Sequence, residues 1–310
     1  MDLKLILARF VRRYLRGLLL EPKLFSFWEA GGFHVTPVHF TSNVPDTRLL
    51  PDSIWQQSSE LVGLEIKSDK QLQLLNIFES SYKLSYDAFP ANKSAIPYEF
   101  FLDNGTFGSI DAEIAYCMVR HFKPRRIIEV GSGASTCLLA QSIVQNQKES
   151  STYSCQLVSI DPYPSEIVKH GLPGHSELIQ RQIQEMPLAF FCDLAENDIL
   201  FIDSTHIAEI GSDVVFEFLE IIPRLKRGVL IHVHDVFLPA SYPRDWIHKE
   251  HWFWNEQYLL QAFLAFNNAF EVLWAGSFMR IQCPDDLKRA FSSFGKFGHW
   301  PGSIWLRRVE

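Results

Sequence analysis

The chain has 310 residues, of which 47% are hydrophobic and 21% charged, a composition that predicts one large folded domain with an additional segment. The formal net charge of −7 argues against sequence-independent binding of nucleic acid, which depends on a basic surface. The five cysteines are scattered and form no CxxC pair, so neither a disulfide framework nor a cysteine zinc site is expected, and a reducing, cytoplasmic location fits best.

Residues 3–20 are predicted to form an amphipathic helix, because apolar side chains recur at helical spacing with arginines between them. No apolar run reaches the roughly 18 residues of a membrane-spanning helix, and the arginines do not suit a signal peptide. The helix could pack on its own domain, pack on a second subunit of a homo-oligomer, or lie on a membrane surface. Residues 1–100 as a whole are expected to form a helical and irregular extension serving as a lid, an oligomer contact or a membrane contact.

The next elements are a helix at 69–85 and a second helix with Ser109 as its N-cap and Asp111 in its first turn, which Lys123 and Pro124 terminate. From residue 125 onward, short apolar runs alternate with helical stretches. Strands are predicted at 126–130, 156–160, 178–183, 199–202, 229–233, 272–274 and 303–307. Helices are predicted at 135–146, 211–222 and 254–268.

This alternation indicates an α/β domain over residues 101–310, with a mostly parallel sheet covered by helices on both faces. Ligands of such sheets bind outside the carboxyl ends of the strands. Four of the predicted strands end in a glycine turn at 131–133, in Asp161, in Asp203, and in the pair His234 and Asp235. We therefore expect one binding site that collects these four groups.

The strongest motif is EVGSGAST at residues 129–136, a glycine-rich turn between a strand and a helix. Such a turn lets a ligand approach the backbone and directs helix amides at it. A dinucleotide site would require GxGxxG, but position 136 is threonine. The motif, with Asp161 closing the second strand, resembles the cofactor signature of class I S-adenosylmethionine-dependent methyltransferases. The resemblance implies a Rossmann-like core with seven strands. It also implies S-adenosylmethionine as cofactor, bound by Gly131, Ser132, Gly133, Ser135 and Asp161, with Glu129 supporting either the turn or the amino group of the cofactor.

A second pattern, DILFIDSTH at 198–206 followed by HVHD at 232–235, resembles the macrocin O-methyltransferase subgroup and, more loosely, metal-dependent catechol O-methyltransferases. The resemblance implies a Mg²⁺ site at Asp203 and Asp235, with His234 as a further candidate ligand, although imidazole favours softer metals. It also implies that His206 is the general base and Asp203 a second catalytic residue. The acids could instead cap helices or bind substrate, and His206 could be a structural partner of Asp203.

The leading hypothesis is methyl transfer to a hydroxyl of a small molecule, such as a sugar or another metabolite, with possible assistance from Mg²⁺. The first alternative is a metal-dependent hydroxylase on the same core, since some relatives of this subgroup are named cephalosporin hydroxylases. The second is a cofactor-binding scaffold subunit without acceptor chemistry. Aromatic residues at 252–258 could stack on an acceptor or anchor a helix, and a packing role is favoured for Trp254 and Tyr258.

Overall fold

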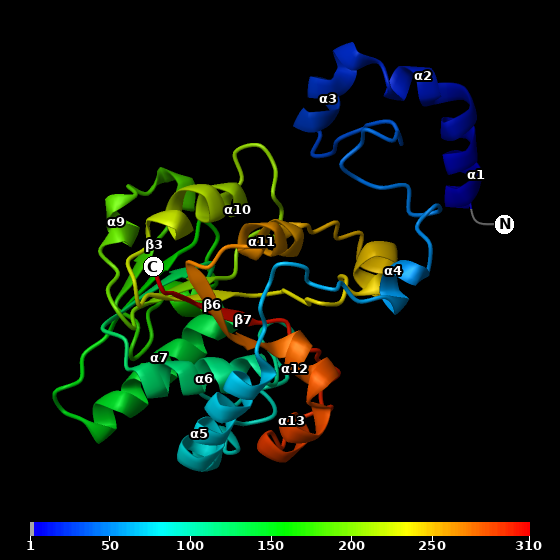
Figure 1. Cartoon of the computed structure of the whole chain (residues 1–310). Coiled ribbons are helices and arrows are strands. Elements are labelled where there is room, and N and C mark those ends of the chain that lie inside the picture. The colour runs from blue at the N-terminus through cyan, green and yellow to red at the C-terminus, as the bar shows by residue number, and fades with distance from the viewer. Residues whose placement is uncertain (1–2) are drawn as a thin grey trace.

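The computed structural model describes residues 3–310, which form a seven-stranded sheet between two helical layers and an N-terminal segment to one side (Figure 1). The order across the sheet is β3-β2-β1-β4-β5-β7-β6. Strand β7 runs antiparallel to both of its neighbours, and the other pairings are parallel. The strands are β1 Arg126–Val130, β2 Gln156–Ile160, β3 Glu177–Ile179, β4 Ile199–Ile202, β5 Leu230–Val233, β6 Phe270–Ala275 and β7 Ile304–Arg308.

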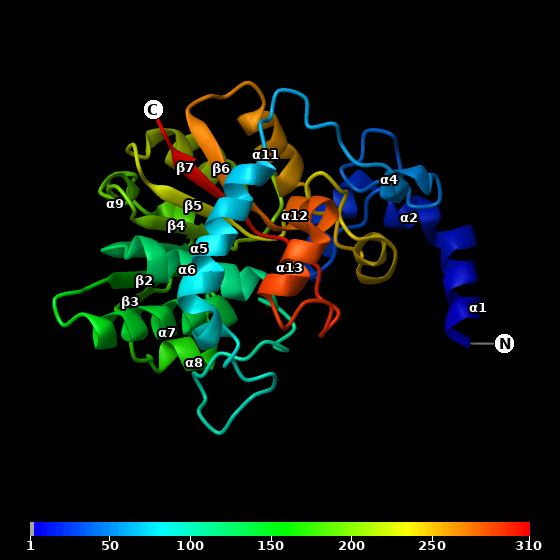
Figure 2. The ribbon, with the colours of Figure 1, turned by 60° about the horizontal axis from the view of Figure 1, so that its bottom comes forward.

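Helices cover both faces of the sheet (Figures 1 and 2). The first layer contains α5 Ser68–Tyr86, α6 Asp111–Phe122, α7 Ala134–Glu149, α8 Glu166–Lys169, α12 Gly276–Gln282 and α13 Pro284–Ala290. The second contains η3 Ile183–Glu185, α9 Ala189–Cys192, α10 Asp213–Phe216 with its continuations η4 Glu217–Ile221 and η5 Ile222–Arg224, and α11 Glu256–Leu264. The predicted α/β class, with a mostly parallel sheet and helices on both faces, is confirmed.

Two apolar cores, one on each face, hold these layers together. Successive strand residues point to opposite faces. Ile127 accordingly belongs to the core beneath α6 and α7, whereas Ile128 belongs to the core beneath α10 and α11. Helix α5 packs into the first core through Leu75 and Phe78, both of which are fully buried. This stretch of the predicted extension is therefore continuous with the sheet domain.

The N-terminal segment consists of short helices: α1 Leu3–Phe10, the π-helical turn η1 Val11–Leu15, α2 Arg16–Leu19, η2 Pro22–Leu24, α3 Phe25–Ala30 and α4 Ser53–Gln56. No residue between 3 and 60 is buried, and the first buried side chain is that of Leu61. Within residues 3–310, no helix combines the length and apolar character needed to cross a membrane.

Several predicted boundaries are wrong. The helix predicted at 254–268 is α11 at Glu256–Leu264, and the strand predicted at 272–274 is β6 at Phe270–Ala275. Ser109 does not cap α6; Ile110, with a φ of 72°, precedes the helix, and its amide donates to the carboxylate of Glu113. The carboxylate of Asp111 accepts hydrogen bonds from the amides of Gly302 and Ser303, which places the first turn against β7. The third strand ends at Ile179 rather than at 183, because the chain then turns into η3.

Candidate functional site

Two adjoining cavities lie at the carboxyl ends of the parallel strands. The first cavity has a volume of about 590 Å³ and is lined by the glycine turn, the end of β2, residues 182–184 and the loop from Asp203 to Asp213. The second has a volume of about 340 Å³ and is lined by residues 132–135, by residues after β4 and β5, and by three tryptophans. Ser132 and Asp203 line both cavities, so the two spaces meet at these side chains.

The glycine turn packs directly against the end of β4. Gly131 has a φ of +84°, and a Cβ atom there would lie 2.1 Å from the carbonyl oxygen of Asp203. Only glycine accommodates both the conformation and this approach. At Gly133, by contrast, a Cβ atom would meet nothing within 4 Å. The two glycines therefore have different roles: Gly131 permits packing of strand against strand, whereas Gly133 leaves space.

Glu129 lies behind the turn, fully buried. Its carboxylate accepts hydrogen bonds from the hydroxyls of Ser135 and Thr136 on α7, both at 2.8 Å, and of Ser159 on β2, at 2.6 Å. Burial raises the pKa of Glu129 to about 7, although the three hydroxyls oppose this shift. Glu129 lines neither cavity and acts by joining β1, β2 and the start of α7.

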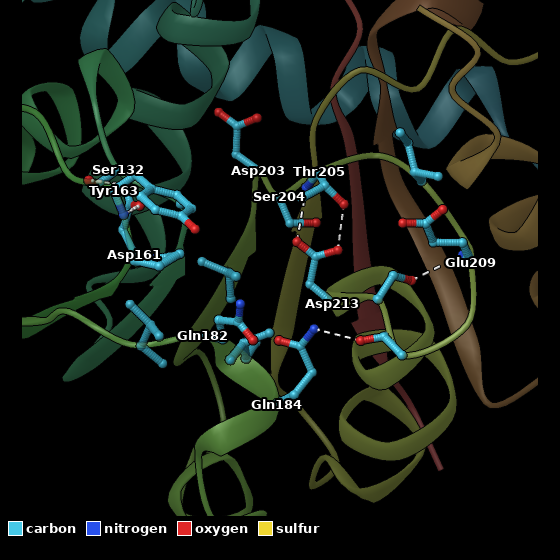
Figure 3. A pocket seen from close by; sticks show the side chains of 18 of the residues that line it. Ser132, Asp161, Tyr163, Gln182, Gln184, Asp203, Ser204, Thr205, Glu209 and Asp213 are labelled. Carbon is cyan, nitrogen blue, oxygen red and sulfur yellow. Dashed lines mark hydrogen bonds between the residues drawn. The ribbon is translucent and has the colours of Figure 1, made fainter. Parts of the chain in front are cut away.

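Asp161 presents its carboxylate at the edge of the first cavity (Figure 3). One oxygen accepts a hydrogen bond from the Ser132 hydroxyl at 2.6 Å, and the other accepts from the amide of Tyr163 at 2.7 Å. Across the cavity, Asp213 accepts hydrogen bonds from the amide and hydroxyl of Thr205. Figure 3 shows Ser132, Asp161 and Tyr163 on one side and Thr205 and Asp213 on the other.

Asp203, His206 and Asp235 form a compact cluster at the second cavity. The Nε2 atom of His206 lies 3.5 Å from Asp203 and 3.4 Å from Asp235, measured to the nearest carboxylate oxygen. One potential ligand atom from each of the three residues lies within 4.8 Å of the others, which is a spacing compatible with a shared cation. His206 and Asp235 both have positive φ values, 62° and 54°. Such strained backbone in non-glycine residues is common at functional sites.

Glu256, at the start of α11, fixes the His206 ring. Its Oε2 lies 2.8 Å from Nδ1 of His206, and the amides of Asn255 and Glu256 donate to the carbonyl of His206. Burial lowers the pKa of His206, but Asp203, Glu256 and Asp235 more than offset this, so the pKa lies well above its usual value. The sequence left Glu256 without a role, and nothing in its local pattern signals a partner 50 residues away.

His234 lies among three carboxylates. Its Nδ1 atom is 3.3 Å from Asp203 and 3.5 Å from Asp235, and its Nε2 atom is 3.8 Å from Asp111. Burial lowers the pKa of His234, but the charges of Asp235 and Asp203 outweigh it and raise the pKa to about 10. The residues whose potential ligand atoms lie within 4.8 Å of one another are Asp203, His206 and Asp235, and His234 lies beside them as a counter-ion of the acids. Its role as a metal ligand stays a prediction.

Three tryptophans form one wall of the second cavity: Trp246 from η6 (Trp246–Glu250), Trp252 and Trp254. The rings of Trp252 and Trp254 stack at 5.0 Å, and the ring of Trp254 lies 4.4 Å from that of His206. Trp254 therefore packs, as predicted, and also faces the cavity. The sequence did not indicate Trp246 as part of this wall, because Trp246 lies outside the aromatic stretch at residues 252–258.

The structure thus brings all the predicted site residues to one edge of the sheet but distributes them differently from the prediction. Gly131, Ser132 and Asp161 line the first cavity. Gly133 and Ser135 line the second, together with Asp203, His206, His234 and Asp235. His232, by contrast, points into the helical layer, where it stacks on Phe201 at 3.8 Å and forms a hydrogen bond with Ser303.

Known proteins share part of this arrangement. Residues 128–236 match the family model described as a methyltransferase domain. The matched stretch runs from β1 to just beyond β5, and so contains the glycine turn, Asp161 and the Asp203–His206–Asp235 cluster. The match supports a methyltransferase core at this edge of the sheet.

A curated protein of Archaeoglobus fulgidus, described as uncharacterized, is 29% identical over 170 residues, which are 53% of this chain and 75% of the relative. Among solved structures, an O-methyltransferase from Bacillus cereus in complex with SAH is 12% identical with a TM-score of 0.35, covering 78% of this chain and 92% of its own. The apo structure of CmcI is 17% identical with a TM-score of 0.38, covering 66% and 72%.

Proposed function

We propose that this protein transfers a methyl group from S-adenosylmethionine to a hydroxyl of a small molecule, such as a sugar or another metabolite. The observation that carries the proposal is the meeting of two cavities at Ser132 and Asp203. A donor in the first cavity and an acceptor in the second would face each other across these residues. Methyl transfer depends largely on such an arrangement, because it holds the nucleophile in line with the methyl group.

The first cavity suits the donor. The carboxylate of Asp161 borders it and can accept hydrogen bonds from two vicinal hydroxyls, as a ribose presents them. The glycine turn admits a ligand close to the backbone at Gly131 and Ser132. Gln182, Ile183 and Gln184 line the far end, where the adenine ring would lie. Asp203 contributes negative charge where the cationic sulfonium of the donor would meet the acceptor.

The second cavity suits an acceptor hydroxyl and the removal of its proton. With Nδ1 of His206 held by Glu256, Nε2 faces the cavity. A cation at Asp203 and Asp235 would offset the carboxylate charges that raise the pKa of His206, and Nε2 could then accept the proton. Glu256 fixes the orientation of the ring, as the carboxylate partner of a general base does. The tryptophan wall offers apolar faces on which a sugar or an aromatic ring can stack.

The acids at the ends of β4 and β5 fit a divalent cation. Mg²⁺ is commonly held by one or two carboxylates and several waters, and Asp203 and Asp235 supply two. A cation held there would lower the pKa of the acceptor hydroxyl. Asp203 and Asp235 would hold it, His234 would balance their charge from the buried side, and His206 would accept the proton.

A second candidate function follows from the same cluster. If His206 is a ligand through Nε2, then Asp203, His206 and Asp235 form a site of two carboxylates and one imidazole, with Glu256 orienting the imidazole. Such a donor set suits a redox-active metal better than Mg²⁺. The protein would then be a metal-dependent hydroxylase-like enzyme. Binding of Fe²⁺ but not Mg²⁺, lost in His206→Ala, would favour this candidate.

The decisive experiment is calorimetric titration with S-adenosylmethionine, with and without Mg²⁺, on the wild type, Asp161→Ala and Asp193→Ala. Asp193 is an exposed acid after α9 and lines neither cavity, so it is the matched control. We expect binding by the wild type and by Asp193→Ala, and its loss in Asp161→Ala. Absence of binding by the wild type under both conditions would refute the donor assignment. Tighter binding with Mg²⁺ would support the coupled cation site.

A further inference from the structure

The N-terminal segment carries large apolar side chains that the rest of the chain leaves exposed. On α1, η1 and α2, the side chains of Leu3, Leu7, Phe10, Tyr14 and Leu18 are between 51% and 78% exposed. Phe27 on α3, and Phe33 and Phe40 after it, are also exposed, by 65%, 52% and 92%. Because an ordered segment that buries none of its apolar side chains gains little from folding, such a surface marks an interaction site.

We propose that residues 3–40, the N-terminal segment, dock on an anionic lipid surface and hold the enzyme at a membrane interface. The five apolar side chains of α1, η1 and α2 recur every three or four residues and so follow one side of the helical path. Such side chains can enter the boundary between headgroups and acyl chains while the helices lie in the plane of the membrane. No membrane-spanning helix is needed for this mode of binding.

Charge complementarity selects an anionic surface. Residues 3–23 contain six cations, Lys4, Arg9, Arg12, Arg13, Arg16 and Lys23, and a single acid, Glu21. The chain as a whole has a net charge of −7, so positive charge is concentrated where the apolar side chains are exposed. Each arginine or lysine near an anionic membrane contributes about 1 kcal/mol of attraction, which corresponds to about a fivefold change in binding.

A lipid surface satisfies both kinds of side chain at once, whereas a second copy of the chain does not. In a symmetric dimer formed through this segment, the same patch would meet itself. The apolar side chains would be covered, but the arginines of both copies would be brought together and would repel one another. At an anionic interface the same arginines meet phosphate groups instead, with which they form charge-assisted hydrogen bonds.

The segment is joined to the wall of the second cavity. Just after it, the indole of Trp55 donates to the carbonyl of Tyr242 at 3.0 Å, and the amide of Ser59 donates to the carbonyl of Pro239 at 2.8 Å. Asp52 also lies 3.3 Å from Arg244. These partners belong to the loop that leads to Trp246, and Figure 2 shows α4 beside it. Docking at a membrane would therefore hold the acceptor side of the enzyme near the lipid surface.

The test is co-sedimentation of the full chain with vesicles of phosphatidylcholine alone, or with about 30% phosphatidylserine, at low and high salt. We expect binding to the anionic vesicles only, weakened by salt. The double variant Leu7→Glu, Phe10→Glu should lose more than about tenfold in binding. Arg12→Gln and Arg13→Gln should each lose about fivefold. The matched control is Leu84→Glu on α5, where the leucine is 92% exposed but lies outside the segment, and its binding should be unchanged.

Light scattering of the same proteins distinguishes a lipid surface from a second copy of the chain as the partner of the segment. We expect no change in mass between the wild type and Leu7→Glu, Phe10→Glu. A wild-type dimer that this variant dissociates, together with no vesicle binding, would overturn the proposal in favour of a second copy. Equal binding of the wild type and this variant to anionic vesicles would also overturn it. Neither result depends on methyl transfer, so the proposed function is tested separately.

Discussion

The two cavities are built in different ways. The first is formed largely by residues that follow β1, β2 and β4 directly. Its functional residues therefore lie in short runs of sequence such as 129–136. The second joins the glycine turn to the ends of β4 and β5 and to three tryptophans, which are far apart in the sequence. Recognition of a common donor can rest on a local motif, whereas acceptor chemistry is assembled by long-range packing.

The sharpest test of this comparison is at Gly131, which packs against Asp203, one of the two residues that line both cavities. Gly131→Ala should destabilise the fold by at least about 3 kcal/mol, because the new Cβ atom would overlap the Asp203 carbonyl and the positive φ would be strained. Urea denaturation measures the loss. Gly133→Ala is the control and should stay within about 1 kcal/mol of the wild type, since its Cβ atom would lie in open space. Equal losses would contradict the different roles of the two glycines.

The next largest effect concerns the first cavity alone. Asp161→Ala should weaken binding of S-adenosylmethionine by roughly 100-fold, because it removes charge-assisted hydrogen bonds to the donor. Binding of Mg²⁺ in the absence of donor should not change, since Asp161 does not belong to the acid cluster. Calorimetry measures both affinities. A loss of Mg²⁺ binding in this variant would show that the two cavities are not separable.

A smaller effect is expected from Glu256→Gln at the second cavity. Glu256 raises the pKa of His206 through its hydrogen bond and its charge, so the variant should lower that pKa. The titration of His206 followed by NMR, without added cation, measures the change. Glu209→Gln serves as the control, because Glu209 lies on the same loop and lines only the first cavity. An unchanged His206 pKa in Glu256→Gln would remove its assigned positioning role.

The smallest effect separates the framework behind the first cavity from the cavity itself. The pKa of Glu129 is about 7 in the folded chain, above the ordinary value of 4.5, so the folded state retains its proton longer. The stability contributed by the neutral form is complete below about pH 4.5 and decreases as the pH rises toward 7. Glu129→Gln removes the titrating group and should flatten this decrease, as measured by urea denaturation across that range. If the stability of Glu129→Gln decreased with pH as much as that of the wild type, the decrease would arise from other buried acids.

Much of the fold could be predicted from the sequence because its strands are marked locally. The bounds of β1, β2 and β4 agree with the prediction to the residue, since each is an apolar run ended by glycine or aspartate. Where the local signal was weak, the prediction was less accurate. Serine is a favoured N-cap residue, yet α6 begins after Ile110. The carboxylate of Asp111 accepts from the amides just before β7, and that of Glu113 accepts from the amide of Ile110.

The sequence by itself determined the α/β class, the glycine turn and the position of acids at three strand ends, because backbone propensity and apolar periodicity act over a few residues. Only the tertiary structure decided that Glu129 braces the turn instead of lining a cavity, that His234 lies among three acids, and that Glu256 holds His206. These roles depend on distances between side chains that are tens of residues apart, which are set when the two layers pack on the sheet.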